Sequence, residues 1–385
     1  MNNHQNRIYL DYAATTPVDD RVMEVMSPFF KSLFGNTSSI HYYGQQAEAA
    51  LENSRQVLAG GLNCQPREVI FTSCGSESDN LALRGVAFAE RERRRADHIL
   101  ISPVEHHAVS RTAQQLAKLH DFEVEFLPVD AQGSVDPQDV VERIRPSTAI
   151  VSVIYANNEI GTINPIAEIG EICKSKNVPF HTDAVQAAAF LSVDVSELNA
   201  DLISLGAHKF YGPKGVGALY IKQGTPIHPV LTGGSQEFGL RAGTHNTPYI
   251  VGMAKAFQLA QEERIQRLAY LRPLRDNLIG QILEEVPESK LTGSIYHRLP
   301  NHASFVFRKA DGNFLLSVLD SKGFACSSGS ACKTGDPEPS EVLTAIGLER
   351  EWALGSLRVT LGTSTSAEEI KAFVSILPEV VRSVR

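Results

Sequence analysis

Apolar runs rich in β-branched residues alternate with amphipathic stretches from about residue 68 onward. The apolar runs predict buried strands at 69–73, 98–102, 149–155, 178–183, 201–205 and 217–221. Apolar positions at helical spacing predict helices at 78–92, 107–119 and 166–176. Strands that alternate with helices are typical of a parallel sheet covered by helices. The pattern therefore predicts an α/β fold with a mostly parallel central sheet.

A different pattern begins near residue 222. A Gly-rich loop, LTGGSQEFGLRAGTHNT, precedes a helical stretch at about 249–285, and 301–385 reads as strand, helix, loop, strand, helix. This succession predicts a smaller α/β domain beside the large one. We expect a large domain at 15–255, a small C-terminal domain at 256–385, and an N-terminal segment at 1–14 packed with the small domain.

Composition and charge exclude several classes of protein. The 385-residue chain is 43% hydrophobic and 21% charged, as globular proteins are. Its formal net charge of −8 argues against general electrostatic binding of nucleic acid. No apolar run reaches the roughly 18 residues that a membrane helix needs, and the start of the chain has no secretory signal. We expect a cytoplasmic protein with no membrane association and no direct nucleic-acid partner.

The cysteines show neither paired spacing nor the Cys/His pattern of a zinc site. They are Cys64, Cys74, Cys173, Cys326 and Cys332. An odd number of cysteines in a long chain without a secretory signal argues against a disulfide framework. We also expect no bound metal.

Polar, chemically capable residues follow five of the predicted strands. In order along the chain they are Gly75 and Ser76, then Glu105, His106 and His107, then Asn157 and Asn158, then Asp183 and Gln186, and finally His208 and Lys209. In open α/β sheets, ligands bind beyond the carboxyl ends of the strands. We therefore expect these residues to converge in one crevice.

Lys209 follows an apolar strand and precedes aromatic and Gly-rich turns. A lysine that is partly desolvated at a strand end has a lowered pKa and becomes a usable nucleophile for a Schiff base. The alternative is an ordinary loop lysine in water, because most lysines are exposed.

The strand-end residues together match what pyridoxal phosphate requires: a helix N-terminus for phosphate, a carboxylate for the pyridine nitrogen, an Asn for the phenolic oxygen, an imidazole over the ring, and a lysine. Each also has a plain structural interpretation. Ser76 could cap its helix, Asp183 could bind backbone amides of the next turn, and the Glu105-His106-His107 run could be a solvated loop or part of a metal site.

Residues 323–340, GFACSSGSACKTGDPEPS, predict an exposed loop. Cys332 is unusual there because cysteines are mostly buried, and neighbouring Lys333 favours its thiolate. The alternative is an inert surface thiol. We expect Cys326 to be a buried spectator, although a disulfide with Cys332 under oxidation stays open.

Arg358 stands inside an apolar strand at 355–362. Its charge is permanent, so burial requires an anionic partner. That partner is either an internal Asp or Glu or the carboxylate of a small amino-acid substrate.

These residues belong to motifs that run from one end of the chain to the other. The motifs are YLDYAATTP at 9–17, FGN at 34–36, ESDNLAL at 77–83, EHHAV at 105–109, NNEIG at 157–161, HTDAVQ at 181–186, HKFYGPKGVGALY at 208–220, RAGT at 241–244, SSGSAC at 327–332 and EPS at 338–340. The chain resembles the cysteine desulfurases of the NifS/IscS type, class-V aminotransferases of the fold-type I (aspartate aminotransferase-like) group.

The resemblance implies a role for each position in binding pyridoxal 5′-phosphate. It assigns Lys209 to the covalent link, His106 to stacking on the ring, Asp183 to the pyridine nitrogen, Asn158 and Gln186 to the phenolic oxygen, and Gly75, Ser76 and His208 to the phosphate, joined by Thr244 from the second subunit of a homodimer.

The resemblance also implies the reaction. L-cysteine would become L-alanine, with Asn36 and Arg358 holding its carboxylate and Cys332 accepting the sulfur as a persulfide. An acceptor protein, an iron–sulfur scaffold or sulfur carrier, would take the sulfur onward for iron–sulfur cluster assembly. The alternatives are a selenocysteine lyase or aminotransferase of the same fold, and an inactive scaffold that binds partners.

The sequence departs from the family pattern at several positions. Cys74 replaces a glycine, Gly206-Ala207 replaces Ser-Gly, Thr37 replaces a proline, Lys333 replaces a common threonine and Thr363 a frequent arginine. The changes at Cys74, Gly206 and Ala207 leave the cofactor affinity open. The chain also ends at Arg385, without the longer tail by which some members dock a scaffold, which leaves the acceptor open.

Overall fold

The computed structural model describes residues 7–328 and 338–385 of the chain. Its centre is a seven-stranded sheet in the order β2-β8-β7-β6-β5-β3-β4. The strands are β2 (Val69–Thr72), β3 (His98–Ile101), β4 (Glu123–Phe126), β5 (Thr148–Ser152), β6 (Phe180–Asp183), β7 (Leu202–Gly206) and β8 (Gly217–Ile221). Within this sheet β8 alone runs antiparallel to the other six strands, so the predicted mostly parallel sheet is confirmed.

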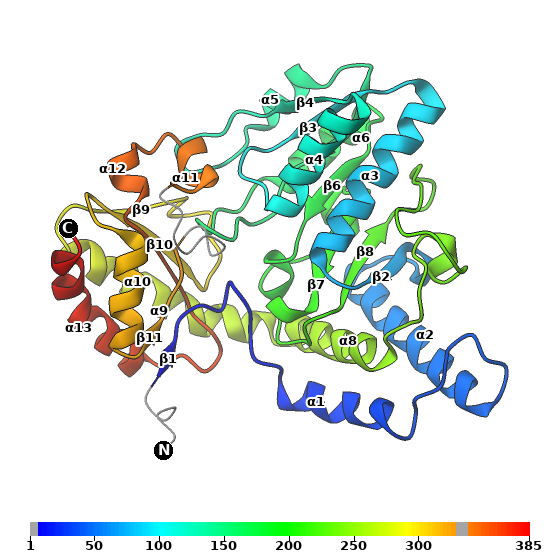
Figure 1. Cartoon of the computed structure of the whole chain (residues 1–385), viewed down its shortest axis with the longest axis horizontal. Coiled ribbons are helices and arrows are strands. Elements are labelled where there is room, and N and C mark those ends of the chain that lie inside the picture. The colour runs from blue at the N-terminus through cyan, green and yellow to red at the C-terminus, as the bar shows by residue number, and fades with distance from the viewer. Residues whose placement is uncertain (1–6, 329–337) are drawn as a thin grey trace.

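Helices cover both faces of this sheet (Figure 1). On one face lie α3 (Gly75–Arg94) and α4 (His107–His120), and the other face is covered by α6 (Ile166–Ser175) and α8 (Thr247–Glu262). Successive strand residues supply the two cores alternately: Ile70, Ile99 and Ile101 belong to the first, and Phe71 and Leu100 to the second. This alternation follows from the period of two along a strand.

A second body is built on a three-stranded antiparallel sheet in the order β12-β10-β9. Its strands are β9 (Ser289–Leu291), β10 (His302–Phe307) and β12 (Ser356–Thr360), and its helices are α9 (Arg264–Glu285), α10 (Gly312–Ser321), α11 (Glu341–Ala345), α12 (Arg350–Ala353) and α13 (Ala367–Ser383). The helical stretch expected at 249–285 is in fact two helices, α8 and α9, which meet at Glu263.

The start of the chain lies against this second body. Strand β1 (Ile8–Tyr9) pairs in parallel with β11 (Phe324–Ala325), and Asp11 forms a bridge with Thr360 of β12. The domain boundaries at 14/15 and 255/256 stay predictions. The remaining helices are α1 (Asp20–Met26), α2 (Tyr42–Leu62), α5 (Pro137–Arg143) and α7 (Val195–Leu198). Within residues 7–328 and 338–385, no helix combines the length and the apolarity needed to cross a membrane.

Candidate active site

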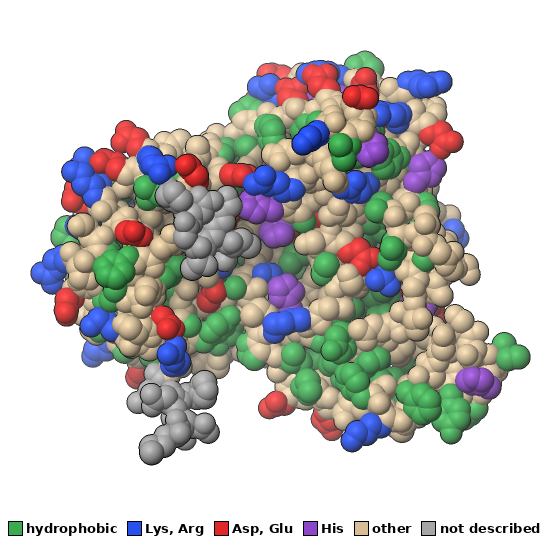
Figure 2. Space-filling model, in the orientation of Figure 1, with side chains coloured by type: hydrophobic (Ala, Val, Ile, Leu, Met, Phe, Trp, Pro, Cys, Tyr) green, Lys and Arg blue, Asp and Glu red, His purple; other side chains and the backbone are tan. Residues whose placement is uncertain are grey.

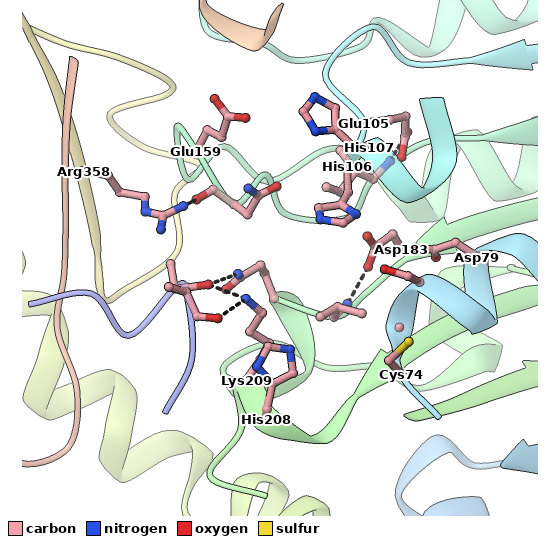
Figure 3. A pocket seen from close by; sticks show the side chains of 18 residues that line it. Cys74, Asp79, Glu105, His106, His107, Glu159, Asp183, His208, Lys209 and Arg358 are labelled. Atoms are coloured by element: carbon pink, nitrogen blue, oxygen red, sulfur yellow. Dashed lines mark hydrogen bonds between the residues drawn. The ribbon is translucent and has the colours of Figure 1, made fainter. Parts of the chain in front are cut away.

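A cavity of about 280 Å³ lies at the carboxyl ends of the central strands, between the two bodies (Figures 2 and 3). Nine of the predicted site residues line it: Gly75, Ser76, His106, Asn158, Asp183, Gln186, His208, Lys209 and Arg358. Asn36 and Thr244 do not line the cavity, and both are exposed. Cys332 lies outside the described residues. Residues from all five strand ends thus line one cavity, which confirms the expected convergence.

Lys209 projects into the cavity from the turn after β7. Its Nζ donates hydrogen bonds to the carbonyl oxygens of Ala13 and Ala14, at 2.6 Å and 2.7 Å. Burial, together with the nearby cation Arg358, lowers the pKa of Lys209 to about 8. A neutral amine is the nucleophilic form, so this lysine is far more reactive near neutral pH than one in water.

Asp183 faces Lys209 across the cavity (Figure 3). Its Oδ1 accepts a hydrogen bond from the Val185 N–H at 2.8 Å, as the plain structural interpretation of this residue anticipates. Burial raises the pKa of Asp183, and His106, the Val185 amide and Lys209 oppose that rise. A cation bound beside this carboxylate would stabilise its ionised form.

Two further carboxyl groups, Asp79 and Glu105, stand next to Asp183, and neither is a predicted cofactor-binding or substrate-binding residue. Burial raises the pKa of both, and the charge of Asp183 raises it further. Oδ1 of Asp79 has no hydrogen-bond partner among the described residues and lies 3.6 Å from Nε2 of His181. Burial lowers the pKa of His181 to about 3, so this imidazole is neutral and the contact is not an ion pair.

His106 caps the N-terminus of α4 and overhangs the cavity. Its Nδ1 accepts a hydrogen bond from the Ala108 N–H at 3.1 Å, so in the neutral ring the proton is on Nε2. Burial lowers the pKa of His106, and the charges of Lys209 and His107 lower it as well. Ligand atoms of His106, Asp79 and Asp183 all lie within 4.8 Å of one another, which is also a spacing that suits a cation.

The N-terminus of α3 opens toward the cavity as an anion site. The N-cap residue is Cys74, whose side chain makes no capping hydrogen bond, so the alternative in which Ser76 caps this helix is wrong. A Cβ on Gly75 would come within 2.6 Å of Cγ2 of Val185, so any side chain at this first position would have to displace Val185. Free amides and the helix dipole together favour a phosphate here.

His208 completes the same end of the cavity. Its Nδ1 lies 3.2 Å from Oγ1 of Thr15. Burial first, and then the cations Lys209 and Lys214, lower the pKa of His208 to about 4. A neutral imidazole can donate one hydrogen bond to an anion without adding charge.

Arg358 has an internal anionic partner, one of the two possibilities that the sequence left open. Its guanidinium donates to Oδ1 of Asp11 and to the carbonyl oxygen of Asn158, both at 2.9 Å. The side chain is only 2% exposed, and its Nε has no hydrogen-bond partner among the described residues. The two bonds use two of the five N–H donors of the guanidinium, and Arg358 also lines the cavity.

Glu159 also lines the cavity, although it is not among the predicted site residues. Its carboxylate accepts a hydrogen bond from the hydroxyl of Ser340, the N-cap of α11. Burial raises the pKa of Glu159 to about 7, and the Ser340 hydroxyl and Arg358 oppose that rise. The signal available in the sequence was its position directly after Asn158.

Cys326 follows β11 and packs against the core from a partly buried position. Burial raises the pKa of its thiol, and the charge of Asp11 raises it further. The thiol is therefore protonated, which supports a spectator role rather than a nucleophilic one.

These residues fit pyridoxal phosphate. The cavity combines a lysine of lowered pKa, a buried carboxylate opposite it, an imidazole above and an uncapped helix N-terminus below. Each of these groups suits one part of the cofactor: the aldehyde, the ring nitrogen, the ring face and the phosphate.

Comparison with known proteins points to the same class of enzyme. A sequence model of the Aminotransferase class-V family matches residues 8–373. The cysteine desulfurase IscS of Dictyoglomus turgidum is 46% identical over 381 residues, which cover 99% of this chain and 96% of that protein. The protein of the same name from Methanosarcina thermophila is 44% identical over 385 residues, covering 100% of this chain and 94% of the relative.

Two solved structures extend the comparison. A NifS-like protein superposes with a TM-score of 0.91 at 36% identity, covering 98% of this chain and 100% of the other. SspA in complex with cysteine superposes with a TM-score of 0.80 at 35% identity, covering 92% and 98%.

The fold and the lysine-bearing cavity are those of the fold-type I enzymes, a class that depends on pyridoxal phosphate. The chain belongs to the class-V aminotransferase family, and within that family to the cysteine desulfurases of the NifS/IscS type.

Proposed function

We propose that this cysteine desulfurase converts L-cysteine to L-alanine with pyridoxal 5′-phosphate bound to Lys209, and that it holds the released sulfur as a persulfide on Cys332. The single observation that carries the proposal is the placement of the Lys209 amine opposite the buried carboxylate of Asp183 in one cavity. The names of the full-length relatives support the choice of substrate.

Eight of the lining residues would take part in holding the cofactor. Lys209 would bind the aldehyde, Asp183 the ring nitrogen and His106 the ring face, while Asn158 and Gln186 would contact the phenolic oxygen. Gly75, Ser76 and His208 would hold the phosphate, with Thr244 supplied by a second subunit. When bound, pyridoxal phosphate withdraws electrons from the substrate Cα and so weakens the bonds around it.

Lys209 is the group that moves the proton. Its pKa of about 8 leaves part of the amine neutral at neutral pH, which is the form that accepts the Cα proton. The carbonyl oxygens of Ala13 and Ala14 accept hydrogen bonds from Nζ and hold the amine at the cavity wall. A positive charge on the ring nitrogen beside Asp183 would favour the ionised form of this carboxyl group.

Arg358 would bind the substrate carboxylate, assisted by Asn36. The guanidinium is fixed by Asp11 and by the Asn158 carbonyl, so it does not have to be ordered when substrate binds.

The transfer to Cys332 balances without another reagent. The thiolate attacks the sulfur of the substrate, an S–S bond forms and the C–S bond breaks. A proton is added at the substrate carbon, which gives alanine, and the transferred sulfur leaves as the outer atom of a persulfide. An acceptor protein, either an iron–sulfur scaffold or a sulfur carrier, would then receive this sulfur for cluster assembly. The enzyme itself would be a cytoplasmic homodimer.

The proposal is tested by incubating the purified holoenzyme with L-cysteine and measuring alanine and protein-bound sulfane sulfur together. We expect equal amounts of the two in the first turnover. Cys332→Ser should keep the cofactor colour but form no persulfide.

Other outcomes point elsewhere. A keto acid instead of alanine would indicate an aminotransferase, activity confined to selenocysteine would indicate a lyase, and no turnover with bound cofactor would indicate a scaffold. Undiminished persulfide formation in Cys332→Ser would overturn the assignment of that cysteine.

A further inference from the structure

The two predicted site residues that lie outside the cavity have sequence neighbours that touch. Asn36 precedes Thr37 and Thr244 precedes His245, and Oγ1 of Thr37 lies 2.7 Å from Nδ1 of His245. The two segments are about 200 residues apart in the sequence, yet this hydrogen bond joins them. Thr37 is also a position at which the chain departs from the family pattern, because proline is usual there.

His245 is fixed on its other side as well. Its Nε2 donates to Oε1 of Glu237 at 2.7 Å, since an ionised carboxylate can only accept. In the neutral ring, Nδ1 then accepts a hydrogen bond from the Thr37 hydroxyl. The side chain of His245 is 9% exposed and Thr37 is buried, so water does not compete freely for these bonds.

Glu237 in turn belongs to a buried network. Both of its carboxylate oxygens accept hydrogen bonds from Arg55, each at 2.8 Å, and Oε2 also accepts the Phe71 N–H at 2.7 Å. Arg55, on α2, lies between the rings of Phe71 and Phe238, with its Cζ 4.9 Å and 5.1 Å from the ring centroids. Such a bidentate, fully paired carboxylate is a rigid anchor.

The backbone at this anchor is strained. Glu237 and Phe238 have φ values of 47° and 58°, in the left-handed region that favours glycine. Strain of this kind persists only where the surrounding structure over-determines it, and it is concentrated at functional sites. The network of Arg55, Glu237 and His245 is what holds the strained turn.

Exposed apolar side chains surround the same place. Phe34, Ile40, Tyr42, Tyr43 and Phe238 are each at least half exposed, and Figure 2 shows hydrophobic side chains gathered over the α1–α2 end of the molecule. Asn36 and Thr244 therefore lie on an apolar surface that suits a second copy of this chain, rather than in their own chain's cavity.

We infer that Thr37 and His245 are positioning residues, and that their hydrogen bond fixes the segment of Asn36 to the segment of Thr244, so that one subunit presents both to the cavity of its partner as one unit. We refer to Thr37, His245, Glu237 and Arg55 as the clamp. The inference rests on the proposed role of Thr244 at the partner's phosphate. The new element is that Thr244 can reach the partner's phosphate only when the clamp is intact.

The test compares Thr37→Val, which removes only the hydroxyl, with Thr37→Ser, which keeps it. In the holoenzyme dimer, hydrogen exchange of amides in 240–247 and the rate of pyridoxal phosphate release are measured. We expect Thr37→Val to exchange faster in that segment and to release the cofactor roughly two- to tenfold faster, the effect of one hydrogen bond. Thr37→Ser should match the unaltered protein.

A second pair of variants checks His245 in the same way. His245→Phe keeps the ring but loses both hydrogen bonds, whereas His245→Gln can donate to Glu237 and accept from Thr37. The Phe variant should reproduce Thr37→Val, adding Thr37→Val to it should have no further effect, and the Gln variant should restore part of the loss. Fully additive effects in the double variant would show that the two residues act separately, and would overturn the inference.

The inference and the proposed function can fail separately. Thr244→Ala tests the contact alone: an unchanged cofactor release rate would remove the cross-subunit contact from the proposed function. Exchange in 240–247 tests the clamp alone, and if Thr37→Val leaves it unchanged the clamp is wrong, whatever Thr244 does. Sedimentation of each variant as a dimer ensures that the comparison is between equal assemblies.

Discussion

At the residue scale, the chemistry of the site depends on how burial shifts the pKa values of a few charged side chains. Lys209 and Asp183 share one cavity. Burial lowers the pKa of Lys209 and raises the pKa of Asp183, so it favours the neutral form of each group. Among the residues that the structure describes, neither side chain is hydrogen-bonded to a group of opposite charge, and the Lys209 amine donates to two carbonyl oxygens instead. The lysine is therefore kept reactive by the lack of an ion pair.

We expect the rate at which the apoprotein captures pyridoxal phosphate to rise with pH and to level off, with its midpoint near the Lys209 pKa of about 8. At pH 7 the neutral fraction, and thus the rate, should be about a tenth of the plateau. Stopped-flow absorbance of the bound cofactor measures this. Lys209→Ala should show no such absorbance, and Lys176→Ala, which replaces an exposed lysine that does not line the cavity, should behave as the unaltered protein. A midpoint near 10.5 would contradict the assignment.

Two carboxylates that share Arg55 allow a matched comparison of stability. Glu237 is 1% exposed and Glu52 is 47% exposed, and both are hydrogen-bonded to this arginine. Glu237→Gln leaves a buried charge without its partner, so we expect it to lower the free energy of unfolding by about 3–5 kcal/mol at pH 7. Glu52→Gln should cost no more than about 1 kcal/mol. Urea unfolding of the two variants checks the difference, and equal effects would contradict it.

The same carboxylate gives a pH dependence with a definite sign. Burial alone would raise the pKa of Glu237, but hydrogen bonds from Arg55 and His245 outweigh it and lower the pKa to about 2. A lowered carboxyl pKa adds stability above the unfolded value of 4.5, and that stability is lost as the pH falls toward 2. Glu237→Gln should flatten the acid limb of the stability curve in that window.

At the scale of elements, the sequence placed the strands of the central sheet well because each is a short apolar run with a polar residue at its end. It missed β4, whose residues Glu123–Phe126 alternate in character and are only partly buried at the sheet edge. It also read α8 and α9 as one helix, because nothing in the local sequence marks Glu263 as a break. Edge strands and helix junctions are set by tertiary contacts that a local pattern does not contain.

Strand β7 and helix α3 meet at the predicted phosphate site. A Cβ added at Gly206 would lie 3.6 Å from the Gly75 nitrogen and 3.3 Å from Cγ1 of Val185. The backbone of Gly206 is extended, with φ of −137°, so other residues can adopt it. A hydroxyl at this position can therefore reach an anion bound at the helix N-terminus.

We expect Gly206→Ser to release pyridoxal phosphate roughly two- to tenfold more slowly than Gly206→Ala, since the two variants differ by one hydroxyl. Comparison with alanine removes the effect of displacing Val185. The release rate is measured after rapid removal of free cofactor. Identical rates for serine and alanine would mean that the phosphate lies elsewhere.

At the scale of the whole molecule, the site is assembled from distant parts. Asp79 lies inside a helix, and Asp11 pairs with Arg358 across 347 residues of sequence. The sequence indicated that Arg358 needs an anion but offered no means of choosing among 44 acidic residues. The pairing of the N-terminal segment with β12, which decides it, is a long-range contact. Asn36 and Thr244 belong to the same scale, because the single chain leaves both outside its cavity.

A mixed dimer tests which cavity Thr244 serves. A dimer of one Lys209→Ala chain and one Thr244→Ala chain has a single intact lysine, and its partner supplies an intact Thr244. If Thr244 acts across the interface, that one site should hold the cofactor as tightly as the unaltered enzyme. Release as fast as in the Thr244→Ala homodimer would instead place Thr244 within its own chain's site. Absorbance and release rate of the purified mixed dimer distinguish the two.

The ion pair between Asp11 and Arg358 also sets an order of events during synthesis. The ribosome makes Asp11 before Lys209 and Arg358 after it. A nascent chain thus contains the Lys209 amine before the Asp11–Arg358 ion pair beside the cavity can form. This ion pair can form only after Arg358 has been made, and a chain truncated before β12 would lack it.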